Sequence, residues 1–212
     1  ESGGFGTTKF LLKTPQGDAS VNFPLNGTHN ILNSLAAAAV GHSFGMTASE
    51  IAAALGSVSA PPQRGEVLRF AAGFTVINDS YNSNPDALLS MVRTLVEYST
   101  ETDRKIVVAG EMLELGDNAA QIHRQTGDSI AKSGADILIG VRGFGRDLAT
   151  GAADSGMEDS RFADDAEMAG EMLAAEIRSG DVVLVKGSRG VRTEKVIEKL
   201  LEKFELEGKA AR

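Results

Sequence analysis

The chain contains 212 residues, of which 21 are Lys or Arg and 29 are Asp or Glu, so its formal net charge is −8. This length suits one large domain or two small ones. Hydrophobic residues make up 42% and charged residues 24% of the chain, which is typical of a folded globular protein rather than a disordered one. The acidic balance argues against broad binding to phosphate backbones, so no nucleic-acid partner is expected.

Three further features narrow the class of protein. No apolar run approaches the roughly 20 residues that span a bilayer, so no membrane insertion is expected. The chain does not open with the charged and apolar regions of a signal peptide. It contains no cysteine, which excludes disulfides, thiolate catalysis and cysteine zinc sites and fits a cytoplasmic location.

In chain order, the first predicted elements are a hairpin and a helix. Residues 9–13 and 20–23 form short apolar or alternating runs, and the Pro-Gln-Gly-Asp sequence at 15–18 between them is a turn signal. Residues 30–40 are rich in alanine and predict a helix, which Gly41 would end. These elements open one unit that runs to about residue 60.

A second helix follows, and then a stiff junction. Residues 48–55 predict a helix, because residues 47–50 have the spacing of a capping box. The Pro-Pro pair at 61–62 cannot continue a helix and suits a domain boundary. The sequence therefore predicts two domains, residues 1–62 and residues 63–212.

After the junction, strands alternate with helices. Short β-branched runs predict strands at residues 74–77, 105–109, 136–139 and 181–185, and residues 66–70 add a strand at the entry. The intervening stretches predict helices at residues 85–98, 118–132, 146–153, 166–178 and 192–204. This alternation is typical of βαβ units, so the expected fold class is α/β, with a mostly parallel sheet covered on both faces.

Ligands of such sheets bind outside the carboxyl ends of the strands, so the loops there are the first place to look for function. The loops that follow the four buried strands hold more polar side chains than a connection requires. They span residues 78–85, 110–117, 140–145 and 186–190.

The first of these loops contains both a helix start and a candidate site. The Asn-Pro-Asp sequence beginning at Asn84 is typical of a helix start, which explains these residues without a function. It does not explain Asp79, Tyr81 and Asn82, which offer a carboxylate, a phenol and an amide on the same loop. An aspartate at the tip of such a strand is a common ligand of ribose hydroxyls, so Asp79 is a candidate for that role.

The last loop, Lys-Gly-Ser-Arg-Gly from Lys186, leads from an apolar strand into a helix. Its glycines permit a tight turn, and Lys186 and Arg189 beside a helix N-terminus favour an anion or carboxylate site. The alternative is a glycine-rich turn with solvated basic side chains. The loop is not a Walker A motif, because GxxxxGK[ST] is absent from the whole chain.

Other polar residues leave two interpretations open. Glu111 and Glu114, with His123 further along, could perform acid–base chemistry or bind Mg²⁺, or the acidic residues could complement a helix N-terminus. Arg64, beside the proline pair, could reach a phosphate between two domains or form a surface salt bridge.

The first predicted helix begins with His29, Asn30 and Asn33, which place three hydrogen-bonding side chains on its first turn. Their spacing is explained by ordinary helix-start residues. Spacing alone therefore predicts no ligand for these three residues.

Taken in order, these segments resemble the motifs of the Mur ligase family. The matching strings are GTHNILN from Gly27 with Ala36 and Ala37, Arg64 with Glu66, DSYNSNP from Asp79, GEMLELG from Gly110, and KGSR from Lys186. The DSYNSNP and GEMLELG strings look most like those of members that add D-alanyl-D-alanine to UDP-N-acetylmuramoyl-tripeptide. The resemblance covers about residues 26–194, with Ser83 and Gly190 where alanine is usual and Thr193 where methionine is common.

The resemblance implies that the chain is a fragment of a three-domain enzyme. Residues 1–62 would be the C-terminal part of the central ATP-binding domain, and residues 63–212 the C-terminal Rossmann-like domain. The P-loop, the Mg²⁺ ligands and the carbamylated lysine of the central domain have no counterpart here, and the chain starts at Glu1 rather than Met. The remaining ligase domains are therefore expected as partners, and the isolated chain is expected to lack turnover.

The family's chemistry implies a reaction in peptidoglycan precursor synthesis. ATP, with Mg²⁺, would phosphorylate the carboxylate of UDP-N-acetylmuramoyl-tripeptide, and the amine of D-alanyl-D-alanine would attack the acyl phosphate. By resemblance, the nucleotide-binding residues are His29, Asn30 and Asn33 near adenine, Arg64 at phosphate and Asp79 at ribose. The residues that would line the cleft for the dipeptide are Tyr81, Asn82, Asn84, Lys186, Ser188 and Arg189. No catalytic residue and no metal ligand is assigned in this chain.

Two alternatives differ from this interpretation. The chain could be a non-catalytic Rossmann-like module that binds a nucleotide or a partner protein. It could also belong to a Mur-type ligase that adds another amino acid.

Overall fold

A computed structural model describes residues 6–25 and 27–208 of the chain. The chain forms two compact units, Glu1–Pro61 and Pro62–Arg212, which are described separately. None of the described helices is both long enough and apolar enough to cross a membrane.

The first unit packs two helices against a hairpin. Strands β1 (Thr8–Thr14) and β2 (Gly17–Phe23) pair antiparallel, and helices α1 (Thr28–Ser43) and α2 (Ala48–Gly56) follow. The hairpin predicted from the Pro-Gln-Gly-Asp turn is therefore confirmed. The small core of the unit consists of Leu12, Val21, Phe23, Ala38, Ile51 and Leu55.

The two helices differ in how well the sequence predicted their ends. The capping box of α2 is present, since the Thr47 hydroxyl accepts from Glu50 N and Glu50 Oε2 accepts from Thr47 N at 2.8 Å. The predicted end of α1 at Gly41 is wrong, because the helix continues to Ser43. A Cβ on Gly41 would lie 3.1 Å from Met46 Sδ and 3.3 Å from Ile51 Cγ1, so this glycine serves the close approach of these side chains.

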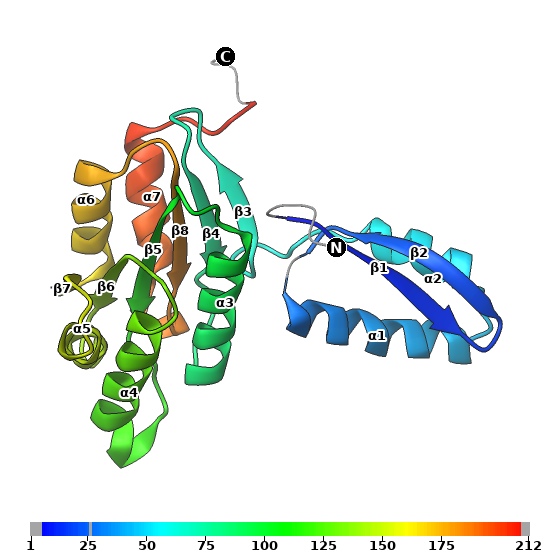
Figure 1. Ribbon diagram of the computed structural model, residues 1–212, viewed down its shortest axis with the longest axis horizontal. Helices are drawn as coiled ribbons and strands as arrows, with labels where there is room; N and C mark the ends of the chain where they lie inside the picture. The colour runs from blue at the N-terminus through cyan, green and yellow to red at the C-terminus, as the bar shows by residue number, and fades with distance from the viewer. Residues whose placement is uncertain (1–5, 26, 209–212) are drawn as a thin grey trace. The chain divides into compact units, whose positions relative to one another are not determined.

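The second unit is built on a six-stranded sheet in the order β3-β4-β8-β5-β6-β7 (Figure 1). The strands are β3 (Glu66–Arg69), β4 (Thr75–Asp79), β5 (Arg104–Gly110), β6 (Ile137–Val141), β7 (Asp159–Ala163) and β8 (Asp181–Lys186). Only β3 runs antiparallel to its neighbour, and the other described pairs are parallel. The prediction of an α/β fold with a mostly parallel sheet is confirmed.

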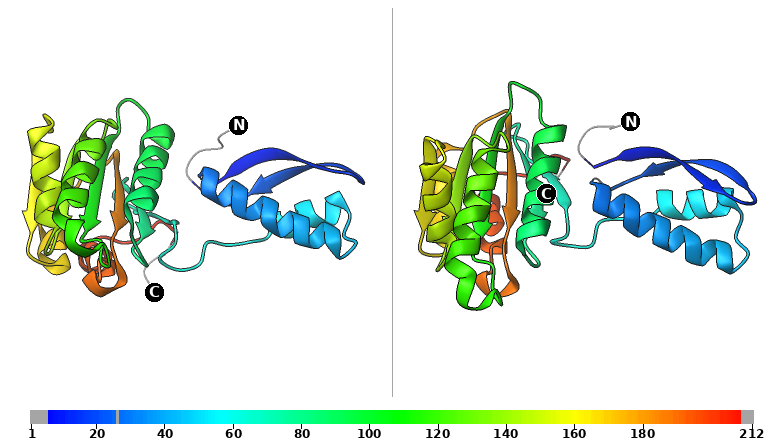
Figure 2. Two further views of the ribbon diagram at one scale, coloured as in Figure 1. Left: turned by 90° about the horizontal axis from the view of Figure 1, so that it is seen from below. Right: turned by 60° about the horizontal axis from the view of Figure 1, so that its bottom comes forward.

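Helices cover both faces of this sheet (Figures 1 and 2). The connections from β4 to β5, β5 to β6 and β6 to β7 advance across the sheet in one direction, so right-handed crossovers place their helices on one face. These helices are α3 (Pro85–Tyr98), α4 (Ala119–Ala131) and α5 (Gly145–Asp154). The chain then returns to β8, and α6 (Ala166–Glu176) and α7 (Glu194–Lys203) cover the other face.

The sequence did not predict β7. Its residues, Asp-Ser-Arg-Phe-Ala, lack the β-branched run of the central strands, and the strand lies at the edge of the sheet with β6 as its neighbour. An edge strand is half solvated and tolerates polar side chains, so its composition does not distinguish it from a loop.

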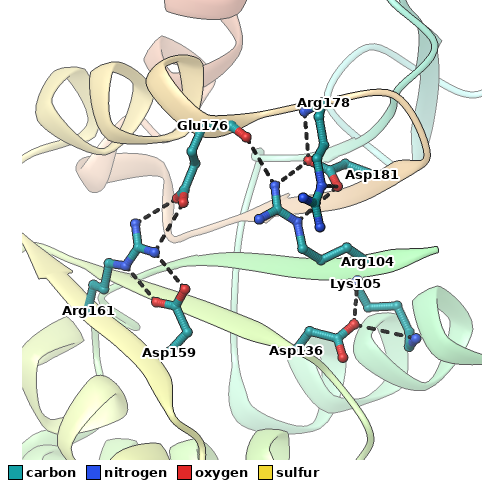
Figure 3. Close-up of polar contacts among 8 residues, drawn as sticks. All are labelled: Arg104, Lys105, Asp136, Asp159, Arg161, Glu176, Arg178 and Asp181. Carbon is teal, nitrogen blue, oxygen red and sulfur yellow. Dashed lines mark hydrogen bonds and ion pairs between the residues drawn. The ribbon is translucent and has the colours of Figure 1, made fainter. Parts of the chain in front are cut away.

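A set of ion pairs joins the amino-terminal ends of the parallel strands (Figure 3). Asp181, which is 1% exposed, accepts from Arg104 Nε at 2.9 Å and Nη2 at 2.7 Å. The hydrogen bonds to Asp181 raise the pKa of Arg104, so the guanidinium stays charged. Arg161 of β7 bridges Asp159 of the same strand and Glu176 of α6. These contacts join β5 to β8 and β7 to α6, at the edge opposite to the loops with candidate site residues.

Candidate functional site

The carboxyl ends of the parallel strands meet at one edge of the sheet, as the arrowheads of β4, β5 and β8 show (Figure 1). The loops that follow β4, β8, β5 and β6 are therefore neighbours. Because β3 runs antiparallel, its first residue Glu66 pairs with Asn78 near the end of β4. The segment just before β3 thus reaches the same edge.

Asp79 and Lys186 form an ion pair at the centre of this edge. Lys186 Nζ lies 2.6 Å from Asp79 Oδ2 and donates also to the carbonyl of Asn82 at 2.7 Å. The lysine side chain is 5% exposed and the aspartate side chain 17% exposed. The first and last candidate loops are therefore joined, and the carboxylate keeps a path to solvent.

Ser188 connects three loops. Its Oγ accepts from Leu113 N at 2.9 Å and contacts the carbonyl of Ser83 at 3.4 Å. Next to it, a Cβ on Gly187 would lie 2.8 Å from Thr193 Oγ1 and 3.3 Å from the Cα of Gly110. Glycine at 187 therefore permits the close approach of the β5 and β8 loops.

Asn82 and Asn84 of the first loop each accept a hydrogen bond from the backbone. Asn82 Oδ1 accepts from Ser83 N at 2.8 Å. Asn84 Oδ1 accepts from Ala87 N at 2.8 Å, so Asn84 caps α3 and Pro85 occupies the first helical turn. The helix-start interpretation of this segment is confirmed, and it leaves the amide nitrogen of Asn84 for any other partner.

Arg64 and Tyr81 stack at the same edge. The guanidinium carbon of Arg64 lies 3.9 Å from the centroid of the Tyr81 ring, which is within cation–π distance. Arg64 is exposed, so its donors remain accessible to an anion. Among the residues that the structure describes, Arg64 contacts this aromatic ring and forms no salt bridge, so the alternative of a surface salt bridge finds no support.

Gln63 is a residue of this edge that the sequence did not predict. Its backbone carbonyl accepts from Tyr81 N at 3.1 Å, and its side-chain oxygen accepts from Arg189 Nη1 at 3.0 Å. Gln63 adopts a φ of 62°, in the left-handed region that few side chains favour. A glutamine after two prolines carries no signal of such a role in the sequence.

His123 does not form an acid–base group with Glu111 and Glu114. The imidazole is fully buried, its Nε2 accepts from Met112 N at 2.8 Å, and its Nδ1 lies 2.6 Å from the carbonyl of Ala119. Burial lowers the pKa of His123, which favours the neutral ring that this bonding requires. Glu111 Oε1 accepts from Phe144 N at 3.3 Å. The histidine therefore holds the β5 loop in place.

His29, Asn30 and Asn33 belong to the first unit, where they lie in the first turns of α1. The side chain of Asn33 is exposed, and those of His29 and Asn30 are half-buried. The structure describes this unit by itself, so the adenine role of these three residues stays a prediction.

Comparison with curated proteins finds several relatives that share one name. The chain is 34% identical over 197 residues to the UDP-N-acetylmuramoyl-tripeptide–D-alanyl-D-alanine ligase of Escherichia coli strain K12, covering 92% of this chain and 42% of that protein. It is 34% identical over 202 residues to the ligase of the same name from Mycobacterium tuberculosis H37Rv, covering 85% of this chain and 39% of that protein. The chain thus spans about two fifths of the length of these relatives.

Solved structures and a family model agree with these relatives. MurF from Acinetobacter baumannii matches with a TM-score of 0.82 and 27% identity over 93% of this chain and 43% of that one. MurF from Thermotoga maritima, solved in complex with ADP, matches with a TM-score of 0.74 and 25% identity over 93% of this chain and 44% of that one. The model for the Mur ligase glutamate ligase domain matches residues 63–189, more than half of the chain. The chain belongs to the Mur ligase family.

Proposed function

We propose that this chain is the carboxyl-terminal part of an ATP-dependent ligase that adds D-alanyl-D-alanine to UDP-N-acetylmuramoyl-tripeptide in peptidoglycan precursor synthesis. The observation that carries the proposal is the Asp79–Lys186 ion pair, which joins two motif loops at the edge of the sheet where ligands of this fold bind. The names of the curated relatives support the choice of dipeptide and tripeptide as substrates.

The proposal assigns residues 1–62 to the central ATP-binding domain and residues 63–212 to the C-terminal domain. Exposed apolar side chains support the first assignment. Leu32 and Val40 of α1 are 61% and 58% exposed, and Phe44, just after this helix, is 85% exposed. A hairpin with two helices leaves such a surface uncovered, and a larger domain would bury it.

In the proposed nucleotide site, Arg64 binds the phosphate and Asp79 binds the ribose. The residues near adenine are His29, Asn30 and Asn33. The exposed guanidinium of Arg64 and the partly exposed carboxylate of Asp79 have the charge and access that these roles need. ATP supplies the phosphoryl group that activates the tripeptide carboxylate, and Mg²⁺ accompanies it. We propose no Mg²⁺ ligand in this chain.

At the dipeptide, the proposal places Tyr81, Asn82, Asn84, Lys186, Ser188 and Arg189. The amine of the dipeptide would attack the carbonyl of the acyl phosphate, an amide bond would form, and phosphate would leave as the amine loses a proton. Lys186 is held by Asp79 and a carbonyl, while the Arg189 side chain is 62% exposed. Arg189 is therefore the cation best placed to reach the dipeptide carboxylate.

The contribution of this chain to the reaction would be positioning and electrostatic stabilisation. The remaining ligase domains would supply the P-loop and the tripeptide site, and the reaction would take place in the cytoplasm, where its nucleotide substrates are made. The isolated chain would therefore show no ligase turnover.

The proposal is tested with the product of the complete reading frame, after the source DNA upstream of the Glu1 codon has been sequenced. We expect a P-loop sequence upstream, and phosphate release that depends on ATP, the tripeptide precursor and D-alanyl-D-alanine together. Lys186→Met should abolish the release, and the matched variant Lys132→Met, at an exposed position of the same unit, should not. Release with another amino acid instead would identify a different Mur-type ligase, and the absence of any release would favour a binding module.

A further inference from the structure

Gln63, in the segment between the proline pair and β3, contacts three other parts of the edge where the parallel strands end, which we call the ligand edge. Its carbonyl accepts from Tyr81 N, its side-chain oxygen accepts from Arg189 Nη1 at 3.0 Å, and its own N–H points to Glu66 Oε2 at 3.5 Å. A single residue thus connects the entry of the unit to the β4 loop and the β8 loop.

The backbone of Gln63 is strained in a way that these contacts explain. Its φ of 62° lies in the left-handed region, which costs a non-glycine side chain free energy and persists only where the surroundings enforce it. In the part of the chain that the structure describes, the other non-glycine residues with positive φ are Glu114, Arg142 and Arg192. They follow β5, β6 and β8, so the strain gathers at the ligand edge.

The remaining contacts of Arg189 do not fix its position as well. Its Nη1 lies 3.5 Å from Glu194 Oε1, at the limit of a hydrogen bond, and its side chain is 62% exposed. An exposed arginine has many rotamers, and ordering it costs conformational entropy. The contact with Gln63 is shorter, so it is the bond that selects one orientation of the guanidinium.

We propose that Gln63 is a positioning residue that orders Arg189 in advance for the carboxylate of the incoming dipeptide. The proposal rests on the function proposed above, in which Arg189 contacts that substrate. Preordering lowers the entropy cost of binding without adding a contact to the ligand. Substitution of Gln63 should therefore weaken the binding of the dipeptide, and it should leave the binding of ATP and the rate of the chemical step almost unchanged.

The test compares Gln63→Gly with Gln63→Asn and with Gln16→Gly, a matched change in the exposed β1–β2 turn. Glycine removes the side chain and relieves the positive φ, so the melting temperature should not fall. In the product of the complete reading frame, Gln63→Gly should raise KM for D-alanyl-D-alanine about threefold to tenfold, since the side chain of Arg189 must then be ordered when the dipeptide binds. The kcat and KM for ATP should change less than about twofold, and Gln16→Gly should change nothing. Asparagine tolerates positive φ but has a shorter side chain, so its effect should be intermediate.

A double-variant cycle separates positioning from a general structural role. If Gln63 acts through Arg189, Gln63→Gly added to Arg189→Ala should raise KM no further. In the 212-residue chain, NMR relaxation of the Arg189 side-chain Nε–H should show faster motion in Gln63→Gly. Additive effects in the cycle, or unchanged Arg189 motion, would overturn the positioning role alone. An unmodified protein with no dipeptide-dependent activity would overturn the proposed function as well, while the NMR measurement would still report whether Gln63 orders Arg189.

Discussion

Lys186 Nζ lies 2.6 Å from Asp79 Oδ2, and this ion pair joins the last residues of the adjacent strands β8 and β4. Both groups are largely buried, so each charge depends on the other for compensation. The pair therefore stabilises the ligand edge, and the proposed contact of Asp79 with ribose is a second role that can be separated from stability by measurement.

Removal of the Asp79 carboxylate should destabilise the second unit. In Asp79→Ala, Lys186 would keep the carbonyl of Asn82 but lose its counter-charge, and a buried charge without a partner costs about 3 kcal/mol. Urea denaturation at neutral pH measures this loss. Asp164→Asn is the control, because the pair of Asp164 with Arg146 is exposed and such pairs contribute about 1 kcal/mol or less. Equal effects of the two substitutions would contradict a stabilising role of the buried pair.

The ring of Tyr81 should affect the binding of ATP, and its hydroxyl should affect the binding of the dipeptide. Tyr81→Leu removes the aromatic face on which Arg64 stacks, so KM for ATP should rise about twofold to fivefold, as expected for an exposed cation–π contact. Tyr81→Phe keeps that face and should leave KM for ATP unchanged. If the phenol contacts the dipeptide, Tyr81→Phe should still raise KM for D-alanyl-D-alanine. Steady-state kinetics of the complete protein distinguish the two roles, and identical profiles for both variants would argue against them.

The main role of Asn84 should be to cap helix α3. Asn84→Ala removes the acceptor for Ala87 N and should lower the free energy of unfolding by about 1 kcal/mol. Asn84→Asp retains an acceptor at that position, so stability should be kept. Aspartate lacks the amide N–H donors, and a rise in KM for the dipeptide in this stable variant would support a substrate contact. An unchanged KM would leave Asn84 with the capping role alone.

Much of the fold could be predicted because its strands and helices differ in local pattern. The central strands are continuous apolar runs, as burial on both faces requires, and the helices between them are amphipathic. Two features depended on tertiary contacts instead. The edge strand β7 carries Asp159 and Arg161, whose partner Glu176 lies on α6. The glycine at position 41 does not end α1. It is present because a side chain there would crowd Met46 and Ile51.

The site was predictable where residues follow strand ends. Asp79 and Lys186 end parallel strands, so their proximity follows from the fold alone. Gln63 was not predictable, since its contacts depend on the antiparallel return of β3 and on a backbone conformation that its residue type does not favour. The acid–base interpretation of His123 failed for a similar reason, because the backbone groups that satisfy its ring are not visible in residue spacing.

Asp181 should be important for stability and not for substrate binding. It accepts two hydrogen bonds from Arg104 and one from Arg178 N, at the edge opposite to the ligand loops (Figure 3). Asp181→Asn should lower the free energy of unfolding by about 3 kcal/mol, because Arg104 loses its counter-charge. Arg178→Gln, at a side chain that is 70% exposed and 4.0 Å from Asp181, should cost about 1 kcal/mol or less. Urea denaturation measures both, and a changed KM for either substrate in folded Asp181→Asn would contradict a purely structural role.

His123 should make the stability of the second unit depend on pH. Burial lowers its pKa below the ordinary value of 6.5, although the bond to the carbonyl of Ala119 and the charges of Glu111 and Asp147 act in the opposite direction. Below pH 6.5 the unfolded chain therefore binds the proton more readily than the folded one. The stability that neutral His123 contributes is complete above this pH and is lost as the pH falls towards the folded-state pKa.

The size of this effect has an upper limit, because one proton changes the free energy of unfolding by at most about 1.4 kcal/mol per pH unit. Urea denaturation between pH 5 and pH 8 measures the slope, and His123→Gln should reduce it, because glutamine does not titrate. The amide of that variant can still accept from Met112 N, so the fold should persist. An identical slope in the two proteins would show that other groups control the acid sensitivity. Stability should fall more steeply with decreasing pH in the unchanged protein than in His123→Gln, because the His123 ring must stay neutral to accept the N–H of Met112.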